Sequence, residues 1–184
     1  MTRNFLRALF GHTRALYRDR RGVSAVEFCF IFPLLAALCL GTAAIIQGVV
    51  LQRKVTLIAA TVANLVTQNT SVSSTDISNF FGASSLILVP ASATPVTIVL
   101  TCVAIDSSGN ATVSWSKSLN ATARTVGTSV SVPTAINVSS SYLIMTEVTY
   151  AYTPTVATNI VGTITLSKTV YMSPRLSTAV TYSS

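Results

Sequence analysis

The first third of the chain holds a long apolar run that is followed by an amphipathic stretch. Residues 28–46 are 19 positions without a charge. As a helix they would reach about 28 Å, close to the thickness of a bilayer's hydrocarbon core. Beyond this run, apolar residues recur at steps of four and three, as on one face of a helix: Leu51, Val55, Ile58, Val62 and Leu65. The pattern predicts a membrane-spanning helix that continues as an amphipathic helix to residue 68.

Two further expectations concern this helix. Pro33 lies inside the apolar run and removes a backbone hydrogen-bond donor, so we expect a kink there. The stripe from Leu51 to Leu65 has two compatible interpretations: it packs on the core of the chain's own domain, or part of it packs against sister helices in an assembly. We favour the first, which implies that a fragment beginning near Arg53 is more stable than one beginning at Asn69.

After residue 68 the helical spacing of apolar residues ends, and the sequence becomes typical of strands. Residues 69–74 are polar, and Thr75 or Asp76 is placed to cap a short helix that reaches Phe81. From residue 86 onward threonine, valine and serine are frequent, which favours strands. One face of the first strand is expected to carry alternating residues: Val96, Ile98, Leu100, Cys102 and Ala104.

Two more segments show strand signals. Residues 106–110 (Asp-Ser-Ser-Gly-Asn) predict a hairpin loop into a strand over residues 112–117, in which Val113 and Trp115 share a face. The clearest alternation predicts a half-buried antiparallel strand with one face formed by Ile160, Ile164, Leu166, Val170 and Met172. The predicted fold class is therefore α+β, a long N-terminal membrane-spanning helix followed by a compact, β-rich antiparallel C-terminal domain.

Charge sets the expected orientation of the helix. Residues 1–22 hold six arginines against one aspartate, formally +5. A basic segment before an apolar span is an export signal, and basic flanks stay on the cytoplasmic side. Only Arg53 and Lys54 lie just past the far end of the run. The arginines nearest the run form the expected orientation signal: Arg18, Arg20 and Arg21. The three expected regions are a basic cytoplasmic leader (1–22), the helix (23–68) and the β-rich domain across the membrane (69–184).

The distribution of charge also excludes a nucleic-acid partner. The formal net charge is +7, but residues 23–184 hold only six basic and four acidic groups and carry +2. These basic residues are scattered and form no aromatic-interleaved basic patch, unlike a phosphate-binding surface. With 50% of residues hydrophobic and 9% charged, the expected partner is instead the lipid bilayer.

Glu27 lies at the edge of the apolar run, where an ionisable side chain is costly and marks a candidate functional site. In one interpretation its carboxylate simply turns outward in the headgroup layer. In the other it acts together with Gly22, because Gly-Val-Ser-Ala-Val-Glu-Phe at residues 22–28 resembles the processing signature of type IV prepilins. That resemblance implies cleavage between Gly22 and Val23, after which the new amine of Val23 would pair with Glu27 of a neighbouring subunit.

The residues after Glu27 narrow the resemblance. Glu27-Phe28 followed by Ile-Phe-Pro-Leu-Leu at residues 31–35 is similar to the TadE-like group of minor pilins, or pseudopilins, of the tight-adherence (type IVc) pilus system. Residues 63–68 and 147–154 resemble the same group more loosely. Membership implies a bacterial inner membrane, a periplasmic domain and a role in assembling an adhesive pilus. The partners that it implies are a prepilin peptidase, a major Flp-type pilin, other minor pilins and the inner-membrane assembly platform.

The inventory of reactive side chains argues against an enzyme. The single histidine, His12, lies in the leader, so neither a Ser-His-Asp nor a Cys-His site is expected in the processed chain. A serine paired with Lys117 or Lys168 has no motif behind it. Without a His or Cys cluster we expect no metal site and no cofactor. The carboxylates past the membrane are far apart in sequence: Asp76, Asp106 and Glu147. Glu147 falls in a predicted strand, where it is either a rim residue or a partly buried acid.

The three cysteines are expected to be unpaired. Cys29 and Cys39 lie about 15 Å apart along a helix, whereas a disulfide needs Cα atoms within about 7 Å. Their expected role is packing. Cys102 falls on an apolar strand face and is expected to be a buried free thiol.

The sequence is also compatible with two other classes of protein. One is a membrane-anchored periplasmic adaptor of the secretion apparatus that keeps its leader and is never polymerised, so leader cleavage separates it from a minor pilin. The other is a secreted or type II anchored glycoprotein, which added glycan mass or cleavage near residue 43 would indicate. It rests on four Asn-x-Ser/Thr matches, at Asn69, Asn110, Asn120 and Asn137.

Overall fold

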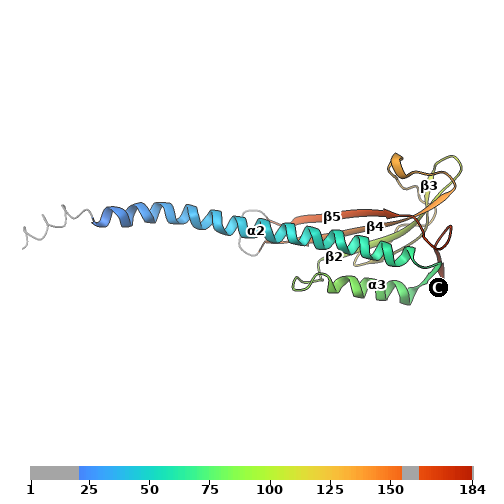
Figure 1. The fold of residues 1–184 in the computed structure, drawn as a ribbon, viewed down its shortest axis with the longest axis horizontal. Helices are drawn as coiled ribbons and strands as arrows, with labels where there is room; N and C mark the ends of the chain where they lie inside the picture. Colours follow the sequence, from blue (N-terminus) through green and yellow to red (C-terminus); the bar gives the residue numbers. More distant parts are fainter. Residues whose placement is uncertain (1–20, 155–161, 184) are drawn as a thin grey trace, which may run out of the picture. The chain divides into compact units, whose positions relative to one another are not determined.

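The computed structural model describes residues 21–154 and 162–183. The chain divides into two compact units, the first ending at Ala43 and the second covering Ala44–Ser184. Helix α2 (Arg21–Thr67) contributes to both (Figure 1), so the long apolar N-terminal helix is confirmed. Arg18, Arg20 and the leader up to residue 20 lie outside the described residues, as does Ile160.

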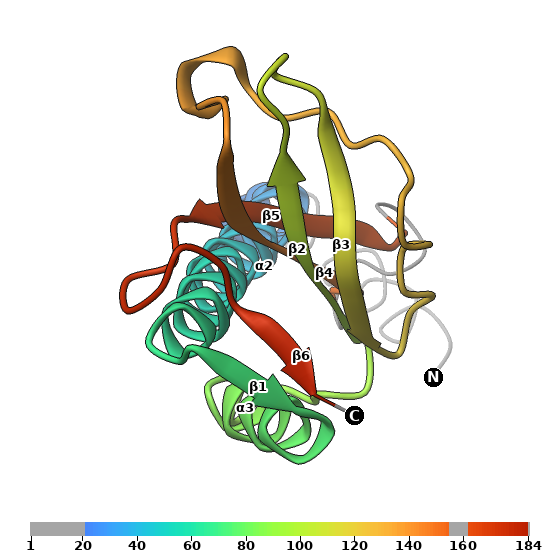
Figure 2. The same ribbon diagram turned by 90° about the vertical axis from the view of Figure 1, so that its right-hand side faces the viewer.

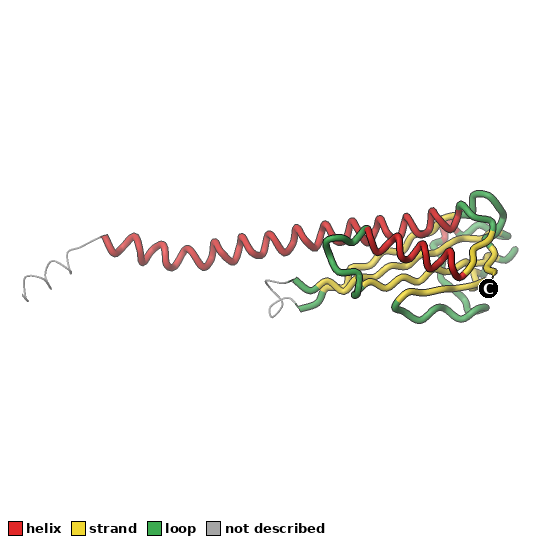
Figure 3. The backbone as a smooth tube through the Cα atoms, turned by 90° about the horizontal axis from the view of Figure 1, so that it is seen from below, coloured by secondary structure: helices red, strands yellow, loops and turns green. Residues whose placement is uncertain are grey.

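Four antiparallel strands form the main sheet, in the order β3-β2-β4-β5. The α+β class is thereby confirmed, because α2 from Ala44 onward and helix α3 cover one face of this sheet (Figures 2 and 3). A second, parallel pair of short strands, β1 and β6, is not predicted by the sequence pattern. The bounds are β1 (Ser71–Ser73), α3 (Ser74–Leu86), β2 (Val96–Ile105), β3 (Ala111–Leu119), η1 (Thr134–Ile136), β4 (Ser141–Tyr152), β5 (Ile164–Met172) and β6 (Thr181–Ser183).

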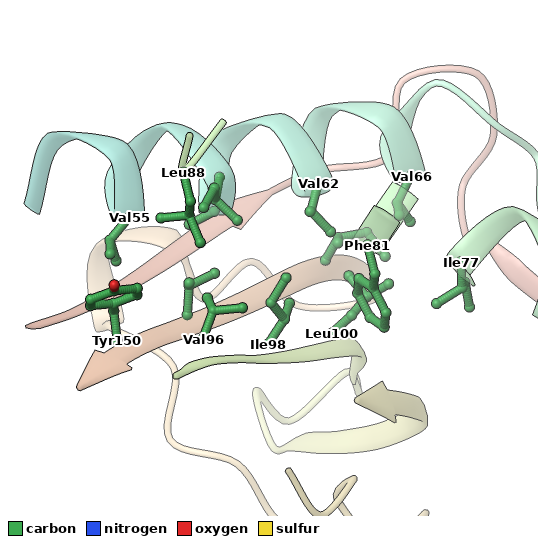
Figure 4. Packing of buried hydrophobic residues seen from close by; sticks show 14 of the residues in the cluster. Val55, Val62, Val66, Ile77, Phe81, Leu88, Val96, Ile98, Leu100 and Tyr150 are labelled. Atoms are coloured by element: carbon green, nitrogen blue, oxygen red, sulfur yellow. The ribbon is translucent and has the colours of Figure 1, made fainter. Parts of the chain in front are cut away.

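The amphipathic stripe of α2 lies in the domain's own core, as the favoured interpretation predicts. Val55, Ile58 and Val62 are fully buried, whereas Leu65 is half-buried and Val66 takes the next core position. The buried side chains of the stripe belong to one cluster with residues of β2, β4, α3 and the turn after α3 (Figure 4). A division of the chain at residue 69 therefore separates segments that share one core.

Helix α3 begins earlier and ends later than expected. Its N-cap is Ser73 rather than Thr75 or Asp76, and the Ser73 hydroxyl accepts the N–H of Asp76 at 3.2 Å. The Asp76 carboxylate accepts in turn from the Ser73 N–H at 2.9 Å, which completes a capping box. The helix continues past Phe81 and buries a further side chain in its last turn.

The expectation that Val113 and Trp115 share a face is wrong. The pairing of β2 with β3 shifts between Cys102 and Val103, so that Cys102 pairs with Trp115 and Val103 pairs with Val113. Ser114 is therefore the extra residue of a β-bulge, which turns its two neighbours to opposite faces. Trp115 joins the core under the helices, and Val113 joins a second cluster on the other face.

Strand β5 is an edge strand that pairs with β4 and agrees with the predicted antiparallel strand at the end of the chain. Leu166 and Val170 pack partly against the main core from one face of β5, while Ile164 is exposed at its start. The sheet is therefore open along this edge.

Candidate functional site

The predicted processing and assembly residues lie in the first four turns of α2. These residues are Gly22, Val23, Glu27, Phe28 and Pro33, and all five are helical. Four positions separate Val23 from Glu27, which is about one turn or 6 Å along the axis, so the two lie on one face. The helix runs without a break across Pro33, and the bend expected there stays a prediction.

The side chains around this segment form an exposed apolar surface. Phe30 is 79% exposed, and the rings of Phe28 and Phe32 lie 5.5 Å apart between centroids. Within residues 21–154 and 162–183, α2 is the one helix long and apolar enough to span a membrane. Soluble chains rarely expose an apolar patch of this extent, so the surface requires an apolar partner. Other large apolar side chains exposed on it are Val23, Val26, Ile31, Leu34, Leu35, Leu38, Leu40, Ile45 and Ile46.

Gly22 has no packing reason to be glycine. A Cβ atom placed there would meet no atom within 4 Å, and the residue is helical. Glycine in a helix is about 1 kcal/mol less favourable than alanine. Packing of the described residues therefore does not require glycine at position 22, as it does not at Gly41 or Gly82.

Where α2 enters the domain, polar contacts fix it to β4 and β5. The Tyr152 hydroxyl donates to the carbonyl oxygen of Ala44 at 3.1 Å, and Gln52 Nε2 donates to the carbonyl oxygen of Ser167 at 3.1 Å. A Cβ atom on Gly48 would lie 3.5 Å from the Tyr152 ring, an ordinary contact. The hydrogen-bonded partners are 108 and 115 positions apart, so no local sequence pattern predicts these contacts.

Glu147 forms an ion pair on the sheet face opposite the helices. Nε and Nη2 of Arg124 donate to its carboxylate at 3.1 and 2.8 Å, and both side chains are partly exposed. Such exposed pairs contribute little to stability on their own. Glu147 is therefore a partly buried acid on an inner strand, one of the two alternatives expected from the sequence, and it anchors the loop that carries Arg124.

The remaining carboxylates and the domain's thiol have structural roles. The Ser73 hydroxyl lowers the pKa of the Asp76 carboxyl, and hydrogen bonds from Asn110 lower the pKa of Asp106 in the β2–β3 hairpin. Cys102 is fully buried and free, and desolvation raises the pKa of its thiol to about 12. The predicted buried thiol is confirmed, and it is unreactive in the folded domain. The described residues contain no cluster of His, Cys, Asp and Glu that would hold a metal ion.

The four Asn-x-Ser/Thr asparagines all use the side-chain nitrogen to which a glycan would be attached. Each Nδ2 atom donates a hydrogen bond inside the domain. The contacts are Asn69 to Leu65 O at 2.7 Å, Asn110 to Asp106 Oδ2 at 2.9 Å, Asn120 to Val96 O at 3.0 Å and Asn137 to Gly109 O at 3.0 Å. These asparagines therefore have structural roles in turns and at element ends.

Comparison with protein-family models, with curated proteins and with solved structures finds no match to this chain. The candidate site is therefore defined by its own chemistry. It combines Gly22, which packing does not require to be glycine, with the carboxylate of Glu27, which lies one helical turn after Val23. Both stand at the start of a long apolar helical surface that the described residues leave exposed.

Proposed function

We propose that this chain is a TadE-like minor pilin, or pseudopilin, of a type IVc (tight-adherence) pilus. Helix α2 spans the bacterial inner membrane, and a prepilin peptidase cuts between Gly22 and Val23. The mature chain then joins the major Flp-type pilin and other minor pilins at the inner-membrane assembly platform. The observation that carries the proposal is the position of Glu27, at the start of an exposed apolar helical surface and five positions after a glycine that packing does not explain.

The dimensions of α2 support the membrane part of the proposal. The uncharged part of α2 that precedes the first contact with the domain lies between Glu27 and Ala44, 17 positions apart. A helix of that length reaches about 26 Å, close to the thickness of about 30 Å of a bilayer's hydrocarbon core. The basic leader stays in the cytoplasm and the domain lies in the periplasm.

The chemistry of the helix start supports processing and assembly. A protease needs unobstructed access to the backbone, and Gly22 offers no side chain. Cleavage frees the amine of Val23 at the positive end of the helix dipole, where a carboxylate such as Glu27 of a neighbouring subunit is favoured. In the low dielectric of the membrane this pairing is stronger than in water, and an unmatched partner is costly.

The size of the domain supports a minor rather than a bulk role. The resemblance implies that the major pilins of such systems are small and nearly all helix, whereas the unit Ala44–Ser184 builds a four-stranded sheet against α2.

Mass spectrometry of pili sheared from cells that produce them tests the proposal. A minor pilin is recovered in the fibre fraction with the mass of residues 23–184. Full-length chain that stays entirely in the inner membrane indicates the non-polymerised adaptor, and added glycan mass or cleavage near residue 43 indicates the glycoprotein. Either of these results contradicts the proposal.

A further inference from the structure

A polar hollow of about 320 Å³ lies on the sheet face opposite the helices, around the ion pair of Glu147. Its floor consists of two paired rows of β2 and β4, in which Thr97 lies opposite Thr149 and Val99 lies opposite Glu147. Residues 122–124 form its wall. The volume is at the lower end of the range of about 300–1,000 Å³ that is usual for small-ligand pockets. The polar hollow lies wholly within the second compact unit, so it does not depend on the insertion of α2 into a membrane.

Hydrogen bonds hold the wall of the polar hollow against the sheet. The backbone N–H of Arg124 donates to Ser116 Oγ at 3.1 Å. The Ser118 hydroxyl donates to the carbonyl oxygen of Ala121 at 2.6 Å. Both serines belong to β3, so the loop after this strand folds back over the neighbouring strand. A site that the scaffold fixes in this way loses little conformational entropy when a ligand binds.

The two charges in the polar hollow neutralise each other and still leave hydrogen-bonding groups unused. Arg124 donates to Glu147 through Nε and Nη2, whereas its Nη1 atom has no hydrogen-bond partner among the described residues. Two N–H donors therefore lie beside the remaining lone pairs of a carboxylate. Because the pair is neutral, Glu147 would repel a phosphate and Arg124 would repel an ammonium group. A hydroxyl group suits both side chains, since it accepts from a guanidinium and donates to a carboxylate.

Threonine hydroxyls extend this pattern across the polar hollow. The hydroxyls of Thr97 and Thr149 hydrogen-bond to each other, which leaves one proton and further lone pairs for a ligand. Thr122 is exposed on the wall. Val99 and Ala123 place apolar surface between these polar groups, where the C–H groups of a ligand can pack. Hydroxyl groups around a small ring of C–H groups match this lining.

We propose that the polar hollow binds a neutral polyhydroxylated ligand, of the size of one hexopyranose ring. Arg124 and Glu147 bind adjacent hydroxyls of the ring, and Thr122 binds a third. The inference goes beyond the proposed pilin function and stands without it, because an adaptor with the same domain would carry the same polar hollow.

An NMR titration of the isotope-labelled full chain tests this binding. The chain is kept in micelles of dodecylphosphocholine, which has no sugar headgroup, and in a buffer without Tris or glycerol, whose hydroxyls would compete. The probes are the methyl α-glycosides of glucose, galactose and mannose. At least one of them should shift the amide signals of residues 122–124 and 147–149 saturably, whereas inorganic phosphate and methylammonium should not.

A matched set of variants locates the binding. Glu147→Gln keeps the size of the side chain but removes its charge, and should weaken binding by about tenfold or more. Thr122→Val removes one hydroxyl and should weaken binding by about threefold. Thr134→Val is the control, because this threonine is also exposed in a loop region but lies outside the polar hollow, and its affinity should be unchanged. Circular dichroism checks that each variant is folded, and if Glu147→Gln is not, Thr122→Val decides.

Absence of saturable shifts with all three glycosides overturns the proposal, and so does wild-type affinity in both Glu147→Gln and Thr122→Val. Saturable binding of phosphate or methylammonium in place of the glycosides overturns the ligand class. The titration involves no pilus, so its failure leaves the pilin proposal standing, which the mass of the chain in fibres tests separately.

Discussion

Glu27 is the residue whose charge matters most to the proposed assembly. It shares a helical face with Val23, and its carboxylate would neutralise the Val23 amine of the next subunit within the membrane. Breaking such a pair leaves one uncompensated charge, at a cost of about 3–5 kcal/mol when the site is buried. A residue that is only solvated in the headgroup layer would instead tolerate loss of its charge.

Glu27→Ala and Glu27→Gln should therefore be processed normally but assemble poorly, with mature protein left in the inner membrane and few or no fibres. Glu27→Asp keeps the charge and should retain part of the assembly. Immunoblots of membrane and fibre fractions measure both steps. Wild-type fibre levels in Glu27→Ala would show that the carboxylate has no pairing role.

At the scale of elements, α2 is a core helix of the domain as well as a candidate span. A fragment of residues 44–184 should fold with mixed helix and sheet circular dichroism, whereas residues 69–184 should not fold cooperatively. The second fragment lacks five large buried apolar side chains of about 1.5–3 kcal/mol each, a total comparable with the whole stability of about 5–15 kcal/mol of a typical domain. These are Leu51, Val55, Ile58, Val62 and Val66. Equal melting temperatures for the two fragments would contradict the shared core.

A matched pair of substitutions tests the same packing one residue at a time. Val62 is fully buried and Leu57 is mostly exposed on the same helix. In the fragment of residues 44–184, Val62→Asp should unfold the domain because a buried unpaired carboxylate costs several kcal/mol. Leu57→Asp should change the free energy of unfolding by less than about 1 kcal/mol. Urea unfolding followed by circular dichroism measures the difference, and similar losses in both variants would show that α2 is not packed as described.

Local periodicity predicted the elements that depend on a single face. The steps of four and three in α2 and the alternation from Val96 to Cys102 both follow from one buried side. The bulge at Ser114 was missed because it depends on how β3 registers against β2. The second cluster around Val103 and the parallel pairing of β1 with β6 were missed for the same reason, since their partners are distant in sequence.

The candidate site was predictable to a different extent at its two ends. Gly22 and Glu27 were singled out by their spacing, and their roles stay predictions; the structure adds only that packing does not require the glycine. The hydrogen bonds from Tyr152 to Ala44 and from Lys54 to Leu88 could not be predicted from the sequence, because each joins residues from separate elements of the fold. The sequence therefore predicted the helix itself but not its junction with the domain.

For the whole molecule, the charge imbalance around α2 predicts its orientation. A reporter that is active only outside the cytoplasm, fused after Ser184, should be active because the leader carries +5 against the two basic residues Arg53 and Lys54. Replacing Arg18, Arg20 and Arg21 by Glu should reduce or invert the signal. Activity of a cytoplasm-only reporter at the same position in the unaltered chain would contradict the topology.

N-terminal sequencing of the protein from pilus-producing cells tests the prepilin assignment most directly. Because cleavage requires a small residue before the cut, the wild-type chain and a Gly22→Ala control should both begin at Val23. Gly22→Leu should accumulate as a precursor that is longer by residues 1–22. A wild-type chain that still begins at Met1 in cells with assembled pili would contradict the account.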